Sequence, residues 1–335
     1  MSSNGRRQTA GVQHVLAQTV HLLGPGELVC NSRELQLLRA DGTTVRLSLT
    51  RGSRLALYGE FHLSTNVFRQ LLRAGVEVAL LSRRAQRLHC QVQILGNARV
   101  MLRHRQHRAA ALTFERLEIA RWLVAAKMRS IEQGMRQLQR HSMADCGSEL
   151  IGLRQYRKGL LAAHQLDEVR GYEGTATAAW WRVFGMAVRK PYLFMMRKRR
   201  PAPDPVNAML GLASTLLCQR VAAELTARGL ELFLGFLHRY RAGRPSLACD
   251  MMEPLRVRFA DRWVLSELNQ RRVMPDDFEA RPNGGLYLRS SKWSRALASW
   301  ERSWLSHQGP DWLGLAVDEL CGRLRGRLPN PPAEG

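Results

Sequence analysis

The sequence predicts an α+β fold, in which a small β-rich N-terminal domain is followed by an all-helical catalytic domain. Two observations predict this order. Short apolar runs separated by glycine- and proline-containing turns fill the chain up to about residue 98. From Arg99 to about His141 the chain is rich in alanine, leucine and arginine and has no proline, which favours helix. The expected division is an extension over residues 1–18, a β-rich domain over 19–98, a helical domain over 99–328 and a tail over 329–335.

The β-rich part is predicted from strand-like runs in quick succession, at residues 19–23, 26–30, 33–39, 43–49 and 53–59. Gly24-Pro25 and Asp41-Gly42 supply turn chemistry between these runs. Ser64 is expected to cap a short helix that stops at Gly75, because serine accepts a backbone N–H and glycine tolerates the left-handed conformation. Two further strands are expected, at residues 76–82 and 87–95.

The helical part is predicted to open with one long helix from Arg99 to about His141, followed by a break at residues 143–148. Glu173 is expected in the first turn of a buried helix over residues 173–188. Asp204 and Pro205 form an N-cap followed by proline at the first helical position, so a helix should run from there to Gly229. The other expected helices cover residues 150–164, 255–270, 292–306 and 311–327.

The charge balance points to a polyanionic partner. The chain has 335 residues with 51 Lys and Arg against 28 Asp and Glu, a formal net charge of +23. Such an excess in a chain with 45% hydrophobic residues indicates a folded nucleic-acid-binding protein and excludes a disordered tail. Only five of the basic residues are lysine, and arginine forks suit phosphate oxygens. A coding bias toward arginine would explain the preference over lysine, but not the excess over acids.

Cysteine usage and hydropathy favour a cytoplasmic protein. The six cysteines are scattered and form no Cys-x-x-Cys pair, so neither a structural zinc site nor a disulfide framework is expected. No run of about 18 uncharged apolar residues occurs, so no membrane span is expected. The first residues contain no long apolar run, and we therefore expect no signal peptide.

The segment from Gly235 to Arg256 carries the densest chemistry in the chain. It holds His238, Asp250 and Glu253 together with four arginines, namely Arg239, Arg241, Arg244 and Arg256. Imidazole and carboxylate groups bind divalent metals, and guanidinium groups bind phosphate. The segment therefore predicts a metal site placed against a phosphate backbone.

Ser246 is expected to cap a helix that ends at Pro254, which would place Asp250 and Glu253 on one face beside a kink. The rest of that helix is apolar, and buried acids need a cation. Glu173 is the best candidate for a further oxygen ligand. Taken singly, these residues have ordinary explanations: an acid at a helix start, a structural histidine and a solvated helix face.

Four segments, at residues 58–84, 171–176, 199–217 and 229–256, occur in an order and at distances that resemble the CRISPR-associated integrase, the larger nuclease of spacer acquisition. The resemblance runs from about residue 20 to about residue 325. It implies the same two-domain order. It also implies one divalent ion, Mg²⁺ or Mn²⁺, bound by Glu173, His238 and Glu253, with Asp250 supporting the site.

The resemblance further implies a metal-dependent DNA endonuclease and integrase, which joins short foreign DNA to a CRISPR repeat array through attack of a 3′-hydroxyl on a phosphodiester. The implied partners are double-stranded DNA (prespacer and leader-repeat), a second copy of the chain in a homodimer, and a small ferredoxin-like companion protein. Two alternatives stay open: a metal-dependent nuclease of branched DNA in repair, and a non-catalytic DNA-binding architectural protein. The candidate DNA contacts, each with a solvated basic face as its alternative, are Arg244, Arg256, Arg241, Arg239, Arg83 and Arg84.

Overall fold

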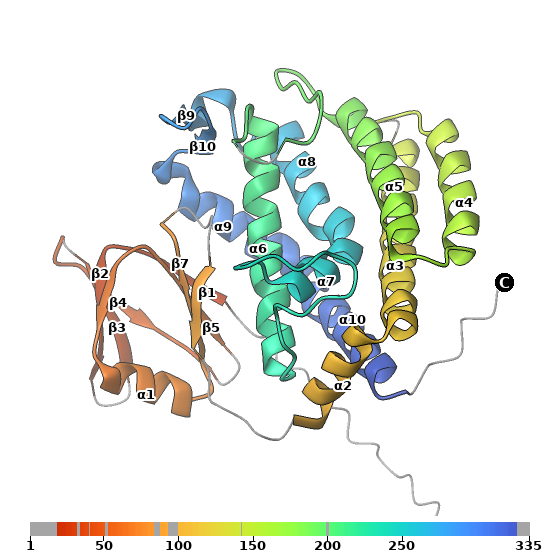
Figure 1. The fold of residues 1–335 in the computed structure, drawn as a ribbon. Coiled ribbons are helices and arrows are strands. Elements are labelled where there is room, and N and C mark those ends of the chain that lie inside the picture. The colour runs from red at the N-terminus through yellow and green to blue at the C-terminus, as the bar shows by residue number, and fades with distance from the viewer. Residues whose placement is uncertain are drawn as a thin grey trace, which may run out of the picture. The chain divides into compact units, whose positions relative to one another are not determined.

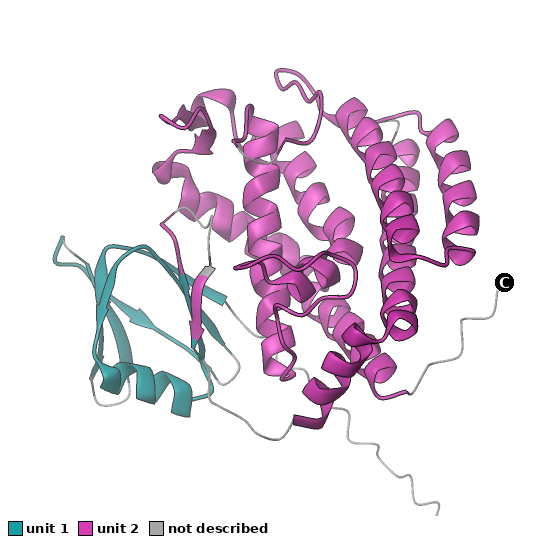
Figure 2. Ribbon diagram, viewed as in Figure 1, with its two compact units in different colours: residues 1–80, 92–94 teal, residues 81–91, 95–335 magenta. Residues whose placement is uncertain are grey.

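The computed structural model confirms the predicted α+β class, with strands early in the chain and helices later (Figure 1). It describes residues 19–31, 34–39, 41–50, 53–83, 88–92, 100–141, 143–198 and 201–326. The predicted extension at 1–18, the tail at 329–335 and the boundary near residue 98 lie outside these residues. Two compact units are present, one of residues 1–80 and 92–94 and the other of residues 81–91 and 95–335 (Figure 2).

Eight strands form two four-stranded sheets in the described early part of the chain. The first sheet has the order β1-β5-β7-β8 and the second the order β4-β3-β2-β6. β1 pairs with β5 in parallel, β2 pairs with β3 antiparallel, and β3 pairs with β4 antiparallel across the predicted Asp41-Gly42 turn. The bounds are β1 Thr19–Leu23, β2 Gly26–Asn31, β3 Glu34–Leu38, β4 Thr44–Leu47, β5 Arg54–Tyr58, β6 Phe61–Leu63, β7 Glu77–Leu81 and β8 Leu88–Val92. Each predicted strand is present, and β6, with only three residues, is the addition.

Helix α1 (Thr65–Arg73) begins and ends where its capping residues predict. The Ser64 hydroxyl accepts the Val67 N–H at 3.3 Å, and Gly75 adopts a φ of 74°, the left-handed region that favours glycine. Val67 and Leu71 lie one turn apart and are both buried in an apolar cluster with strand residues such as Leu55. The first compact unit thus has a core of its own.

The helices of the second unit are α2 Val100–Ala111, α3 Thr113–Arg140, α4 Gly147–Leu161, α5 Leu166–Ala187, α6 Pro205–Ala227, α7 Ser246–Arg256, α8 Arg262–Asn269, α9 Ser290–Ser306 and α10 Gly309–Leu324. The single long helix predicted up to His141 is wrong, because Leu112 has extended backbone (φ −85°, ψ 118°) that separates α2 from α3. No proline or glycine marks this break. The turn lets α2 reach a distant loop, where Gln106 bonds to two backbone carbonyls.

Two other expectations are corrected. Helix α5 begins at Leu166, so Glu173 lies in its interior and not in its first turn; Asp167 and Glu168 occupy that turn instead. The second unit is also not wholly helical, because β9 (Phe278–Ala280) and β10 (Leu286–Leu288) form an antiparallel hairpin after a short 3₁₀ turn at Pro275–Asp277. The intervening Pro-Asn-Gly-Gly sequence at 282–285 is typical of such a turn.

Helix α7 packs against α3 on one side and α6 on the other, and α3 also packs against α5 (Figure 1). Among the described helices, α6 alone is long and apolar enough to cross a membrane by length and composition. Just over half of that stretch is buried inside the protein, as in the core helix of a water-soluble domain. α3, α5 and α7 are the elements that carry the candidate site.

Candidate active site

Helix α7 runs without interruption through Pro254, so the predicted end or restart at that residue is wrong. Proline has no N–H to donate to the carbonyl of Asp250. A π-helix at Val257–Asp261 follows three residues after the proline and joins α7 to α8, with wider turns than an α-helix. Such bulges frequently occur at functional sites. Here it follows directly after Glu253 and Arg256.

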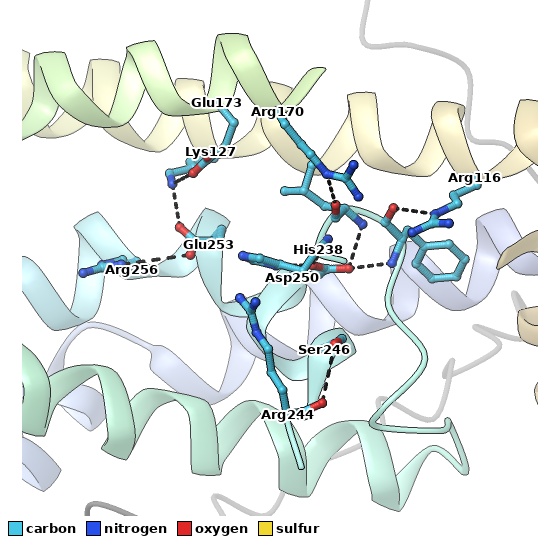
Figure 3. Close-up of polar contacts among 12 residues, drawn as sticks. Arg116, Lys127, Arg170, Glu173, His238, Arg244, Ser246, Asp250, Glu253 and Arg256 are labelled. Atoms are coloured by element: carbon cyan, nitrogen blue, oxygen red, sulfur yellow. Dashed lines mark hydrogen bonds and ion pairs between the residues drawn. The ribbon is translucent and has the colours of Figure 1, made fainter. Parts of the chain in front are cut away.

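Asp250 is fully buried and holds the loop that carries His238 (Figure 3). Its Oδ2 accepts the N–H groups of Phe236 at 2.6 Å and Leu237 at 2.9 Å. Its Oδ1 accepts the backbone N–H of His238 at 3.1 Å and contacts the Nδ1 of the same residue. With Nδ1–H donated to the carboxylate, Nε2 of His238 keeps its lone pair for a metal ion.

Three side chains from other helices hold the same loop from outside. Each donates hydrogen bonds to backbone carbonyls of residues 231–237 at distances of 2.8 to 3.0 Å. The donors are Gln106 of α2, Arg116 of α3 and Arg170 of α5, and the acceptors are Glu231, Leu234, Phe236 and Leu237. The position of His238 therefore depends on four separate helices, counting α7.

Lys127 of α3 brings Glu173 of α5 and Glu253 of α7 together (Figure 3). The lysine side chain is 4% exposed, and its Nζ pairs with Glu173 Oε1 and lies 2.6 Å from Glu253 Oε2. This Oε2 is buried, and the Lys127 ammonium is the cation that it faces. Two carboxylates from different helices thus share one cation in the protein interior.

Charges around Glu253 keep it ionised despite its burial. Burial raises the pKa of Glu253, but the positive charges of Lys127 and Arg256 outweigh it and lower the pKa to about 2. Arg256 is itself buried, with Nη1 4.0 Å from Glu253 and Nε 3.4 Å from Asp261. Asp261 also accepts the indole N–H of Trp180 at 2.8 Å, and burial raises the pKa of this carboxyl.

The predicted metal ligands are therefore found in two neighbouring clusters. Glu173 and Glu253 meet at Lys127, and His238 is held by Asp250. Within the described residues, no three His, Cys, Asp or Glu side chains are already gathered as a metal site. Both oxygens of Asp250 are engaged by the loop, which suits a supporting residue. The alternative of a solvated helix face is wrong, because Asp250 and Glu253 are both buried, as the apolar surroundings of the two acids predicted.

The residues present fit a divalent ion. Glu253 contributes a buried oxygen, Oε2, that already faces one cation, the Lys127 ammonium at 2.6 Å, and Glu173, 24% exposed, lies on the other side of the same lysine. Nε2 of His238 is the remaining donor, since Nδ1 contacts Asp250. Two carboxylates with one imidazole are an acceptable donor set for Mg²⁺ and suit Mn²⁺ well.

The predicted DNA-contacting arginines have different surroundings. Arg239 and Arg241 are exposed on the loop after His238, and Arg239 lies 3.4 Å from Asp167. Arg244 is half-buried, and its side chain extends toward His238 (Figure 3). Arg256 is 4% exposed and is tied to Glu253 and Asp261, which is a structural position. Arg83 is exposed, and Arg84 lies outside the described residues.

Sequence reasoning missed Lys127, Asp261, Arg116 and Arg170. For Lys127 a signal was available. It lies four residues after Leu123 and four before Ile131, both fully buried, so a charge occupies the apolar face of a long helix. A buried charge on such a face requires a partner of opposite sign. For Arg116 and Arg170 no such signal exists, because their acceptors are backbone carbonyls far along the chain.

A family model described as "CRISPR associated protein Cas1" matches residues 20–302. The chain belongs to the Cas1 family. CRISPR-associated endonuclease Cas1 1 of Thermus thermophilus is 32% identical over 319 residues, which cover 92% of this chain and 96% of the relative. CRISPR-associated endonuclease Cas1 2 of Rhodospirillum rubrum is 30% identical over 301 residues, 85% and 86% of the two chains. The predicted resemblance is thereby confirmed.

Solved structures of Cas1-like proteins share the fold. A Cas1 protein from Thermotoga maritima superposes with a TM-score of 0.82 at 20% identity, covering 95% of this chain and all of that one. A casposase bound to an integration product gives 0.78 at 21% identity, covering 95% and 94%. At the level of the Cas1 family, the prediction of a CRISPR-associated endonuclease is confirmed.

Proposed function

We propose that this chain is a metal-dependent DNA endonuclease and integrase, which inserts short foreign DNA into a CRISPR repeat array by attack of a 3′-hydroxyl on a phosphodiester. The observation that carries the proposal is the buried cation position between Glu173 and Glu253. Glu253 lies on the same helix as Asp250, which orients His238. Two carboxylates converge on one cation in the interior of a strongly basic protein. An architectural DNA-binding protein binds through surface charges and does not require such buried acids.

Glu173, Glu253 and Nε2 of His238 would hold one Mg²⁺ or Mn²⁺ ion. When bound, the ion supplies positive charge for the phosphate undergoing attack and favours ionisation of the attacking hydroxyl. Asp250 keeps Nδ1 of His238 protonated and holds its loop through three backbone N–H groups. Arg256 anchors Glu253 from the far side and is itself anchored by Asp261.

The loop after His238 would hold the DNA backbone. Arg239 and Arg241 are exposed, and Arg244 extends toward His238, so the three offer guanidinium groups beside the proposed ion. Binding energy from phosphates near the reacting one positions the strand for in-line attack. The excess of basic residues over the whole chain supplies the remaining, sequence-independent attraction for the duplex.

The partners follow from the same proposal. The chain of a structure titled "Cas6-RT-Cas1--Cas2 complex" has this fold, with a TM-score of 0.76 at 20% identity, and the present chain covers 36% of it. That likeness supports a Cas2-type companion, which would be the small ferredoxin-like protein. We further propose that the chain works as a homodimer in the cytoplasm, on prespacer and leader-repeat DNA.

The test is a strand-transfer assay. The protein and its companion are mixed with a supercoiled plasmid carrying a leader and one repeat, and with a labelled prespacer bearing 3′-hydroxyl ends. The expected result is a joined product that requires Mg²⁺ or Mn²⁺ and the 3′-hydroxyl and is lost in Glu173→Ala. Hydrolysis of branched DNA without joining would favour the repair nuclease, and metal-independent binding without any reaction would favour the architectural protein.

A further inference from the structure

Lys127 is the only buried lysine among the chain's five. Its neighbours along α3 are apolar and fully buried, including Leu123, Val124 and Met128. The ammonium group is directed to the two carboxylates that the proposed function assigns to the metal. The proposed function assigns no role to this residue, although a buried charge requires a partner of opposite sign.

The two carboxylates need a cation whether or not a metal is present. Glu253 is buried, and Glu173 lies next to it across the lysine nitrogen. Without a positive charge between them, their repulsion and the loss of solvation would destabilise the fold. Lys127 supplies that charge from within the chain, so α5 and α7 can each pack against α3 before any ion arrives.

The same geometry sets Lys127 against a divalent ion. Its Nζ lies 2.6 Å from Glu253 Oε2, and an Mg²⁺ ion bound to that oxygen would lie at about 2.1 Å. Because Nζ also pairs with Glu173 Oε1, it fills the space between the two carboxylates, and an ion that bound both Oε1 of Glu173 and Oε2 of Glu253 would need that space. Two cations at such close range repel strongly in a buried environment, so both cannot remain there.

We propose that Lys127 is an internal counter-ion that occupies the cation position between Glu173 and Glu253, competes with the divalent metal for these carboxylates and moves aside when the metal binds. The inference rests on the proposed function, because it takes these residues as metal ligands. It assigns a regulatory role to the lysine: the protein folds with a cation already between the two carboxylates, and the metal binds only as tightly as displacement of the ammonium allows.

The first experiment compares Mn²⁺ binding by isothermal titration calorimetry in the full-length protein, Lys127→Met and Lys158→Met. Methionine keeps the length of the side chain without its charge, and Lys158 is an exposed lysine that serves as the matched control. The expected result is an increase in Mn²⁺ affinity of at least about 10-fold for Lys127→Met and none for Lys158→Met. In EDTA, Lys127→Met should have a lower melting temperature than the unaltered protein. In Mn²⁺ without EDTA, the melting temperature of Lys127→Met should rise by more than that of the unaltered protein.

The second experiment uses the unaltered chain and so does not depend on whether Lys127→Met folds. The protein is labelled with ¹³C-lysine, which yields side-chain signals from only five residues, and Lys127→Arg identifies the signal of interest. Titration with diamagnetic Mg²⁺ should shift the ε-CH₂ signal of Lys127 in step with occupancy. The signals of Lys158, Lys190, Lys198 and Lys292 should stay in place.

The outcomes separate the inference from the proposed function. If the unaltered protein binds Mn²⁺ and loses binding in Glu173→Gln, but Lys127→Met binds no more tightly, the inference is overturned and the proposed metal site stands. The inference is also overturned if the ε-CH₂ signal of Lys127 does not shift when the metal site is saturated with Mg²⁺. If neither the unaltered protein nor Lys127→Met binds Mn²⁺, the proposed function fails and the inference fails with it.

Discussion

Asp250 and Glu253 are three residues apart on one helix, yet they perform different tasks. Asp250 accepts three backbone N–H groups and contacts the imidazole of His238, so its role is to position that residue. Glu253 instead faces the cationic side chains of Lys127 and Arg256, and the structure gives its Oε2 no backbone N–H partner. A ligand for an incoming ion must have such an oxygen, whereas Asp250 has none to spare.

Asp250→Asn should destabilise the protein and misplace His238. The amide brings an NH₂ group to a site where backbone N–H groups need acceptors, so at least one buried donor stays unsatisfied. We expect a loss of about 2–4 kcal/mol in the free energy of unfolding, measured by urea denaturation. Asp167→Asn is the control, because that carboxylate is exposed, and it should leave stability nearly unchanged. Equal stability of the two variants would contradict the assigned role of Asp250.

The charge of Glu253 should stabilise the metal-free protein in a defined range of pH. Its pKa falls from 4.5 to about 2 on folding, so its contribution is fully present above about pH 4.5 and is lost as pH falls toward 2. The difference in unfolding free energy between the unaltered protein and Glu253→Gln, measured in EDTA, should be on the order of 3 kcal/mol at pH 7. It should shrink below pH 4.5, and a difference that stays constant down to pH 3 would refute this assignment.

At the scale of elements, the loop at residues 229–245 and helix α7 form a single structural unit, because Asp250 of α7 accepts backbone N–H groups of the loop. The loop has little regular structure, and its backbone groups are satisfied by Asp250 from inside and by side chains of α2, α3 and α5 from outside. Gly235 lies where the loop passes closest to α7, since a Cβ there would stand 2.5 Å from Asp250 Oδ2 and 2.9 Å from the carbonyl carbon of Ser246. This approach requires glycine.

Gly235→Ala should therefore displace the loop from Asp250 and abolish strand transfer. The clash is with a buried carboxylate and with helix backbone, neither of which can move freely. We expect a lower melting temperature and at least about a 10-fold loss of joined product, by analogy with the effect of small displacements of reacting groups. Gly211→Ala in α6 is the control, since a Cβ there meets nothing within 4 Å and alanine favours helix. It should melt slightly higher and retain activity.

At the scale of the whole molecule, a net charge of +23 makes affinity for DNA steeply dependent on salt. The combined substitution of Arg239, Arg241 and Arg244 by glutamine should weaken binding and reduce the slope of log K against log salt by about 2–3. Fluorescence anisotropy with labelled duplex at several KCl concentrations measures this slope. Arg256→Gln should instead lower stability and leave the slope unchanged, because that guanidinium is buried. A slope reduced equally by both would show that Arg256 contacts DNA.

The sequence by itself determined the α+β class, the strands and most helix ends, because alternation, capping residues and turn glycines act over a few neighbouring positions. It also indicated Glu173, His238 and Glu253 as the candidate ligands through their surroundings and family resemblance. Only the tertiary structure decided that Leu112 breaks a helix, that α7 continues through Pro254 into a π-helix at Val257–Asp261, and that Lys127 joins the two glutamates. Each of these depends on which helices pack together, since a buried charge takes its partner from whatever element lies opposite, however distant along the chain.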